Sequence, residues 1–443
     1  MSFTVDVDQN PYLPEGGKTV SAIVTVTAGE DVGTGASAPA GGSGGSSTGS
    51  GSGSAEIIIV DCSGSMDVPA TKISSARQAV TAAIDVLPDG TAFAIVAGTS
   101  TAWPVYPADG GMAIADSASR AAAQRAAAGL RANGGTAIGQ WLQLARQIFQ
   151  TRPTTLRHAI LLTDGKNQHE TPQELDAAVA ACEGVFNCDC RGIGADWEVS
   201  ELRRVSTALL GTVELIREPE QLAADFAAMA QNAMGKQVAD VSLRVWTPQS
   251  AHVQLVKQVA PEMVDLTERR AATGAQAGDY PTGAWAPGES RDYHVSVAVN
   301  AAGLGQEMLA ARVSLVLTTA AGSEVLGQGL VRAVWTADEA LSTKINSRVA
   351  HYTGQAELAD AIQEGLEARK AGDEETATSK LGRAVALAKE SGNEQTAKLL
   401  AKVVDVVDAA TGTVKLKKSV DKMDEMELDT RSTKTVRVKK EQA

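Results

Sequence analysis

The chain has 443 residues, of which 44% are hydrophobic and 21% are charged, so it is long enough for two or three soluble domains. The net charge of −13 and the aromatic content of 4% disfavour nucleic-acid binding, which needs a basic surface or stacking side chains. The sequence contains four cysteines, too few for a disulfide framework, and it has no recognisable signal peptide or long apolar run. We therefore expect a cytoplasmic protein with no membrane span.

The first predicted element is a strand at residues 18–28, where apolar and polar residues alternate. It has no partner strand nearby, and residues 1–32 are assigned to the N-terminal strand or strands of a β-sandwich completed later in the chain. Residues 33–54 are rich in Gly and Ser and are expected to form a flexible linker.

Strands and helices alternate between residues 55 and 236. Short apolar runs predict strands at 55–60, 91–98, 157–163, 187–194 and 211–216, with a proline-containing edge strand at 101–107. Helical spacing of apolar residues predicts helices at 71–87, 114–131, 138–150, 172–182, 199–208 and 219–234. This order predicts a doubly wound, Rossmann-like parallel sheet covered by helices on both faces.

The helical spacing disappears between 237 and 336, where strand-like segments alternate with Gly, Pro and Asn turns. We expect an antiparallel sandwich that strand 18–28 completes, so that the α/β domain is an insertion within it. Amphipathic segments with short breaks predict a helical bundle at 337–413, including a third helix at 394–412. The polar residues 414–443 are expected to form a flexible tail.

The loop after strand 55–60 reads Asp61-Cys62-Ser63-Gly64-Ser65. Ligands of open parallel sheets bind at the carboxyl ends of strands, so the Asp61, Ser63 and Ser65 oxygens are expected on one side. One carboxylate and two hydroxyls are hard ligands, suited to Mg²⁺ or Mn²⁺ and poor for zinc. Taken alone, the motif is equally compatible with an ordinary turn, because Ser, Gly and Asp are common turn residues.

This segment, DCSGSM, resembles the Asp-x-Ser-x-Ser motif of von Willebrand factor A (VWA) domains. Two further motifs match that family in the same order: Gly-Gly-Thr136 before a predicted helix, and Leu-Thr-Asp164-Gly at the end of an apolar strand. The resemblance covers about residues 55–236. It implies a complete metal ion-dependent adhesion site (MIDAS) for Mg²⁺, or for Mn²⁺ or Ca²⁺, with the ligands Asp61, Ser63, Ser65, Thr136 and Asp164.

The resemblance implies a non-enzymatic protein that captures an Asp or Glu carboxylate of a partner protein through the bound cation. The whole arrangement is similar to intracellular bacterial, actinobacterial-type VWA proteins, which often work with Ser/Thr kinases and forkhead-associated (FHA) proteins. Two alternatives remain open. The chain could be an adaptor subunit for a separate AAA+ ATPase, since it has no Walker motif of its own, or an extracellular adhesin.

Catalytic and zinc-binding functions fit the sequence less well than a MIDAS does. Asp61 resembles the nucleophile of haloacid dehalogenase phosphatases, but Ser63 stands where those enzymes need a second aspartate. The Gly-x-Ser-x-Gly pattern falls only in the linker, and the five histidines are scattered along the chain. Three clustered cysteines, Cys182, Cys188 and Cys190, could supply thiolates for zinc. Cys188 and Cys190 lie in a predicted buried strand and no Cys-x₂-Cys pair occurs, which favours buried, inert thiols.

Three threonines, Thr430, Thr433 and Thr435, lie among Arg and Lys residues in the predicted tail and are candidate phosphorylation sites. A phosphate would add a charge of about −1.5 to −2 and create a ligand for an FHA-type phosphothreonine reader. The alternative is a solvated charged tail without a signalling role.

Overall fold

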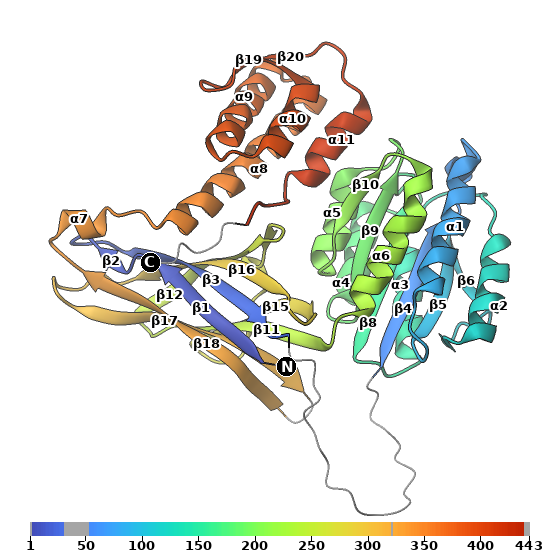
Figure 1. The fold of residues 1–443 in the computed structure, drawn as a ribbon, viewed down its shortest axis with the longest axis horizontal. Helices are drawn as coiled ribbons and strands as arrows, with labels where there is room; N and C mark the ends of the chain where they lie inside the picture. Colours follow the sequence, from blue (N-terminus) through green and yellow to red (C-terminus); the bar gives the residue numbers. More distant parts are fainter. Residues whose placement is uncertain (1, 31–52, 320–321, 438–443) are drawn as a thin grey trace, which may run out of the picture. The chain divides into compact units, whose positions relative to one another are not determined.

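The computed structural model describes residues 2–30, 53–319 and 322–437. It divides into two compact units, one formed by residues 37–239 and the other by residues 1–36 together with 240–443 (Figure 1). The predicted linker, apart from its last two residues, lies outside the described residues. No helix in the described part of the chain is long and apolar enough to cross a bilayer.

The α/β unit contains the predicted parallel sheet, with strand order β10-β9-β8-β4-β5-β6 and β7 paired with β5. The five parallel strands are β4 (Ser54–Asp61), β5 (Ala92–Gly98), β8 (Leu156–Thr163), β9 (Asn187–Ile193) and β10 (Val213–Ile216). Two antiparallel strands, β6 (Ala102–Tyr106) and β7 (Ala113–Ile114), pair with β5 on the side away from β4. The edge position of 101–107 fits its two prolines, which cannot donate to a central ladder.

Six α-helices cover this sheet: α1 (Thr71–Asp85), α2 (Ser117–Ala128), α3 (Ile138–Gln150), α4 (Pro172–Cys182), α5 (Val199–Ala208) and α6 (Leu222–Met234). Helix α1 packs against α2 and α6, and α3 packs against α4. Ile58 and Val60 of β4 belong to the core under α1 and α6, while Ile57 and Ile59, which point the other way, are equally buried. Both faces of the sheet are therefore covered, which confirms the doubly wound prediction.

A charged triad lies near the amino ends of β4, β8 and β9, with Glu56 fully buried and His158 and Asp189 partly buried. The Nδ1 atom of His158 lies 2.9 Å from a Glu56 carboxylate oxygen, and its Nε2 lies 3.0 Å from Asp189 Oδ2. Burial alone would lower the pKa of His158, but the two carboxylates outweigh it and raise this pKa to about 10. The imidazolium therefore donates to both carboxylates at neutral pH.

We expect His158→Gln to lower the free energy of unfolding by about 3 kcal/mol near neutral pH, because the fully buried Glu56 carboxylate loses its cation. The folded-state pKa of about 10 lies above the ordinary value of 6.5. The stability difference between wild type and variant is therefore complete below about pH 6.5 and is lost as the pH rises through about 10. Urea unfolding at about pH 6 and about pH 9 measures it. An equal difference at both pH values would contradict this assignment.

The second unit contains two mainly antiparallel sheets whose strand orders are β1-β3-β16-β12-β13 and β14-β15-β11-β17-β18-β2. The first sheet contains β1 (Phe3–Gln9), β3 (Thr19–Ala28), β12 (Ala251–Ala260), β13 (Val264–Asp265) and β16 (Ser290–Val299). The second contains β2 (Tyr12–Leu13), β11 (Val238–Trp246), β14 (Ala271–Ala272), β15 (Ala277–Trp285), β17 (Glu307–Thr319) and β18 (Gly322–Trp335).

The two sheets pack closely where β1 crosses β18. A Cβ atom built on Gly329 of β18 would come 2.4 Å from Val7 Cγ2 of β1, so only glycine allows this approach. Strand β3 pairs antiparallel with β16, with Val24 opposite Tyr293. The chain thus leaves this unit after β3 and returns to it at β11. Strands β1 and β15 were not predicted, and β15 contains Gly and Pro residues that weaken a strand pattern.

The C-terminal region begins with helices α7 (Glu339–Ser342), α8 (Ser347–Ala371), α9 (Glu374–Glu390) and α10 (Glu394–Val403). It continues with the hairpin β19 (Val404–Asp408) and β20 (Thr413–Leu416) and with helix α11 (Lys422–Arg431). The predicted helix at 394–412 therefore ends early, because its β-branched second half forms a strand instead. The expectation of a flexible tail is also corrected for the described residues 414–437, since β20 packs on α9 and α11 packs on α8 and α10.

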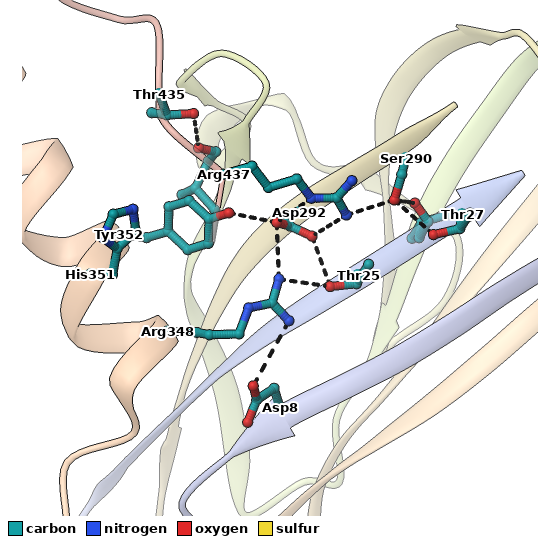
Figure 2. A network of polar contacts seen from close by, with 12 residues as sticks. Asp8, Thr25, Thr27, Ser290, Asp292, Arg348, His351, Tyr352, Thr435 and Arg437 are labelled. Atoms are coloured by element: carbon teal, nitrogen blue, oxygen red, sulfur yellow. Dashed lines mark hydrogen bonds and ion pairs between the residues drawn. The ribbon is translucent and has the colours of Figure 1, made fainter. Parts of the chain in front are cut away.

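The last described residues, 433–437, lie along the edge of the first sheet. The backbone N–H of Met263 donates to Thr433 O over 2.8 Å, and that of Thr435 donates to Pro261 O over 3.2 Å. Figure 2 shows where this segment ends: Arg437 reaches Asp292 of β16 beside Arg348 of α8. Residues 433–437 are therefore bound to the sandwich through main-chain hydrogen bonds and an ion pair.

Candidate metal centre

The five predicted site residues lie at the carboxyl edge of the parallel sheet. Asp61 is the last residue of β4, and Asp164 follows β8 directly. These strands are adjacent and parallel, with Val60 opposite Leu162, so their two following loops leave the sheet side by side. Ser65 lies in a short 3₁₀ turn, η1 (Gly64–Asp67), and Ser63 is the residue before this turn.

Asp61 is fully buried and its carboxylate is held by hydrogen bonds on both oxygens. The Ser63 backbone N–H donates to Oδ1 over 2.7 Å, and the Thr163 hydroxyl donates to Oδ2 over 2.6 Å. Burial raises the pKa of Asp61 to about 6, although these hydrogen bonds oppose the shift. The fold thus holds a poorly solvated carboxylate in one orientation, an arrangement that a nearby cation would stabilise.

The two serine hydroxyls connect this loop to Asp164. Ser63 Oγ lies 3.0 Å from Ser65 Oγ, and the Ser65 hydroxyl donates to Asp164 Oδ1 over 2.7 Å. The other Asp164 oxygen accepts from the ammonium of Lys72 over 2.7 Å, and both of these side chains are buried. The oxygens of the first and third motifs therefore meet in space.

Thr136 comes from the loop before α3, which hydrogen bonds to the loop after β4. Asn133 N–H donates to Cys62 O over 2.7 Å, and Gly64 N–H donates to Gly134 O over 3.0 Å. A Cβ atom built on Gly165 would lie 3.4 Å from Thr136 Oγ1 and 3.5 Å from Ser65 Oγ. The Thr136 hydroxyl thus lies on the same side of Gly165 as the Ser65 hydroxyl, so the three motifs share one edge.

Three further residues of this edge were missed by the sequence analysis. Thr163 had been assigned only to a strand, and His169 had been counted among the scattered histidines, although its Nδ1 accepts from Thr136 N–H over 3.1 Å. The sequence pattern could have identified Lys72 as a buried residue. It lies on the α1 face that also bears Ala76, Ala79 and Ala83, and a lysine in such an apolar row needs a buried partner.

Two family models match this sequence: the von Willebrand factor type A domain at residues 55–215 and the von Willebrand factor type A C-terminal domain at residues 386–432. A solved structure described as von Willebrand factor type A from Catenulispora acidiphila is 52% identical to the chain. The match covers 99% of this chain and 97% of that one, with a TM-score of 0.91. The chain belongs to the von Willebrand factor type A family.

A more distant relative supports only the fold of this VWA protein and says nothing of its function. The ArnB paralog VWA2 from Sulfolobus acidocaldarius is 14% identical, with 98% of each chain covered and a TM-score of 0.56. No curated protein matches the sequence. VWA domains are in general non-enzymatic protein-interaction domains, and they commonly bind a divalent metal at the MIDAS.

The residues at this edge of the VWA domain fit a hard divalent cation. Two carboxylates and three hydroxyls offer oxygen atoms only, as Mg²⁺ prefers. The described residues contain no cluster of three or more His, Cys, Asp or Glu side chains that could hold a metal ion. A site with few carboxylates leaves a bound ion electrophilic.

The cysteines of the VWA domain are all buried. Burial raises the pKa of Cys62 to about 12 and that of Cys182 to about 11. For Cys188, a hydrogen bond with Cys190 and burial raise the thiol pKa well above its usual value. These buried thiols pack as small hydrophobic side chains in the core.

The three threonines near the C-terminus use their hydroxyls as hydrogen-bond donors. Thr430 is buried in α11 and donates to Met426 O over 2.9 Å. Thr433 donates to the Glu262 carboxylate over 2.9 Å, and Thr435 donates to Val259 O over 2.6 Å. Phosphorylation at these positions stays a prediction, and each phosphate would replace a donor that the fold uses.

Proposed function

We propose that this VWA protein binds a divalent cation, Mg²⁺ in the first place, at a complete MIDAS and uses it to capture a carboxylate of a partner protein. The observation that carries the proposal is the connected set of oxygens at one sheet edge. In this set Ser63 contacts Ser65, Ser65 donates to Asp164, and the Thr136 hydroxyl lies on the same side of Gly165 as the Ser65 hydroxyl. Manganese and calcium are alternative ions for the same donors.

The residues would hold the ion as follows. The hydroxyls of Ser63, Ser65 and Thr136 and the two aspartates supply oxygens, some of them through water. The bound ion supplies Lewis acidity toward an incoming carboxylate. The role of the protein is to fix these donors before the partner arrives, and the hydrogen bonds from Thr163 to Asp61 and from Ser65 to Asp164 do this.

Capture of the partner tests this function. The tagged full-length protein is incubated with native lysate of its host, once with Mg²⁺ and once with EDTA, and Thr136→Ala is treated in parallel. We expect at least one protein to be retained only by the wild type with Mg²⁺. Retention that is unchanged by EDTA and by the substitution would refute metal-dependent capture.

The identity of the captured protein distinguishes the finer alternatives. A Ser/Thr kinase or an FHA protein would support a signalling role, and phosphopeptide mapping of the three threonines would then complete that test. A ring ATPase would support the adaptor role, and a secreted or surface protein would support adhesion. We place the signalling role first because the chain is similar to actinobacterial-type VWA proteins, which often work with Ser/Thr kinases and FHA proteins.

A further inference from the structure

Lys72 places a positive charge directly on one of the proposed metal ligands. Its Nζ donates to Asp164 Oδ2 over 2.7 Å, and its side chain is only 8% exposed while that of Asp164 is 0% exposed. The ammonium also lies 4.0 Å from Asp196 Oδ2, whose side chain is 73% exposed. The Asp164 pair is therefore the contact shielded from water, and a shielded ion pair is much stronger than an exposed one.

The fold delivers this ammonium from the side of α1. Lys72 lies in the first turn of the helix, where its backbone N–H donates to Pro69 O over 3.0 Å. Its aliphatic part passes Gly194, the residue after β9, where an added Cβ would meet Lys72 Cε at 3.5 Å and Nζ at 3.7 Å. Gly194 has a φ of +74°, which disfavours other residues. The path of the lysine side chain is thus defined by surrounding atoms.

We propose that Lys72 is a built-in counter-ion that sets the charge of the metal site. This inference rests on the proposed function. Asp61 and Asp164 bring two formal negative charges, and Lys72 cancels one of them. A bound divalent ion then keeps a net positive charge, which attracts a carboxylate from the partner. The same ammonium competes with the ion for Asp164, so the site holds its metal less tightly and its partner more tightly than the five donors alone would.

A purely structural role for Lys72 makes a different prediction. If the lysine only neutralised a buried aspartate, its loss would disturb the loop and weaken metal binding and carboxylate binding together. A counter-ion gives opposite signs instead: removing the positive charge tightens metal binding and weakens carboxylate binding. The pair of measurements separates the two roles.

The experiment compares the full-length wild type with Lys72→Met and Lys72→Gln, which remove the charge, and with Lys72→Arg, which keeps it. Titration calorimetry with Mn²⁺ and with Mg²⁺ gives the metal affinity, and acetate, followed by water-proton relaxation of the Mn²⁺-loaded protein, is the carboxylate probe. We expect both neutral variants to bind metal about tenfold more tightly and acetate several-fold more weakly. Lys72→Arg should stay within about threefold of the wild type in both.

Lys166→Met is the matched control. It removes a lysine charge from the same loop as Asp164, but Lys166 pairs with Glu198 and is 43% exposed, so we expect little change in either affinity. Thermal unfolding with and without Mn²⁺ shows whether each variant is folded. The neutral variants should be less stable than the wild type without metal and should gain more stability from Mn²⁺.

The outcomes separate this inference from the function on which it rests. If the wild type binds neither Mn²⁺ nor Mg²⁺, the proposed metal site itself is wrong. If the wild type binds metal but the neutral variants bind it equally or less tightly, or bind acetate no more weakly, the counter-ion role is wrong and the MIDAS proposal stands. A neutral variant that does not fold even with Mn²⁺ also overturns the counter-ion role, because metal should then stabilise it.

Discussion

Asp61→Asn should greatly weaken divalent cation binding while leaving the metal-free VWA domain at least as stable as the wild type. The carboxylate is fully buried, and burial is the main cause of its raised pKa, so its charge costs stability when no cation is bound. Removing the charge takes away the ligand but also takes away that cost. We expect metal affinity to fall by about a hundredfold or more, measured by titration calorimetry with Mn²⁺.

Asp67→Asn is the control for this prediction. Asp67 lies in the same loop and carries the same charge, but its side chain is exposed in η1. We expect its metal affinity and melting temperature to match those of the wild type. Melting curves with EDTA complete the comparison. Metal binding by Asp61→Asn at the wild-type affinity would show that the ion binds elsewhere, and the proposed function would then be wrong.

Asp292→Ala should be the most destabilising single substitution that we propose in the sandwich unit. Asp292 is fully buried, and its carboxylate accepts from Arg348 over 2.9 Å and from the Tyr352 hydroxyl over 2.6 Å. It also accepts from Thr25 over 2.8 Å and from Arg437 over 3.0 Å (Figure 2). These partners keep the pKa of Asp292 below its usual value even though burial raises it.

Loss of this carboxylate leaves the largely buried Arg348 guanidinium without its main counter-charge. We expect the free energy of unfolding to fall by about 3–5 kcal/mol, measured by urea unfolding. Hydrogen exchange should rise most in the segment around Thr435 and in the first turns of α8, which the network ties to β16. Arg437→Ala, in contrast, should free the C-terminal segment with only a small loss of global stability, because Arg437 is 38% exposed.

The control for this network is Asp265→Ala. Asp265 belongs to β13 in the same sheet, is 54% exposed and lies 3.9 Å from Lys257, so we expect a change of less than about 1 kcal/mol. If Asp292→Ala unfolds at the same urea concentration as Asp265→Ala, the network does not stabilise the attachment of α8 and the C-terminal segment.

The two sites show how far the sequence alone reaches. The parallel sheet was predictable because a strand buried on both faces needs a continuous apolar run, and β4 and β8 both have one. The place of the three motifs at one edge of the sheet was also predictable, since each motif follows or precedes a recognisable strand or helix. Helix α10 was predicted too long, because Val404–Asp408 has a β-branched pattern that also suits an amphipathic helix.

The sequence by itself determined the class of the α/β domain and which polar residues lie at its carboxyl edge, because apolar periodicity and motif spacing are local properties of the chain. Only the tertiary structure decided which charges neutralise which. Lys72 and Asp164 are 92 residues apart, and Asp292 and Arg437 are 145 apart. Pairs at such separations are selected by packing, and the stability of a buried charge depends on the partner that packing brings to it.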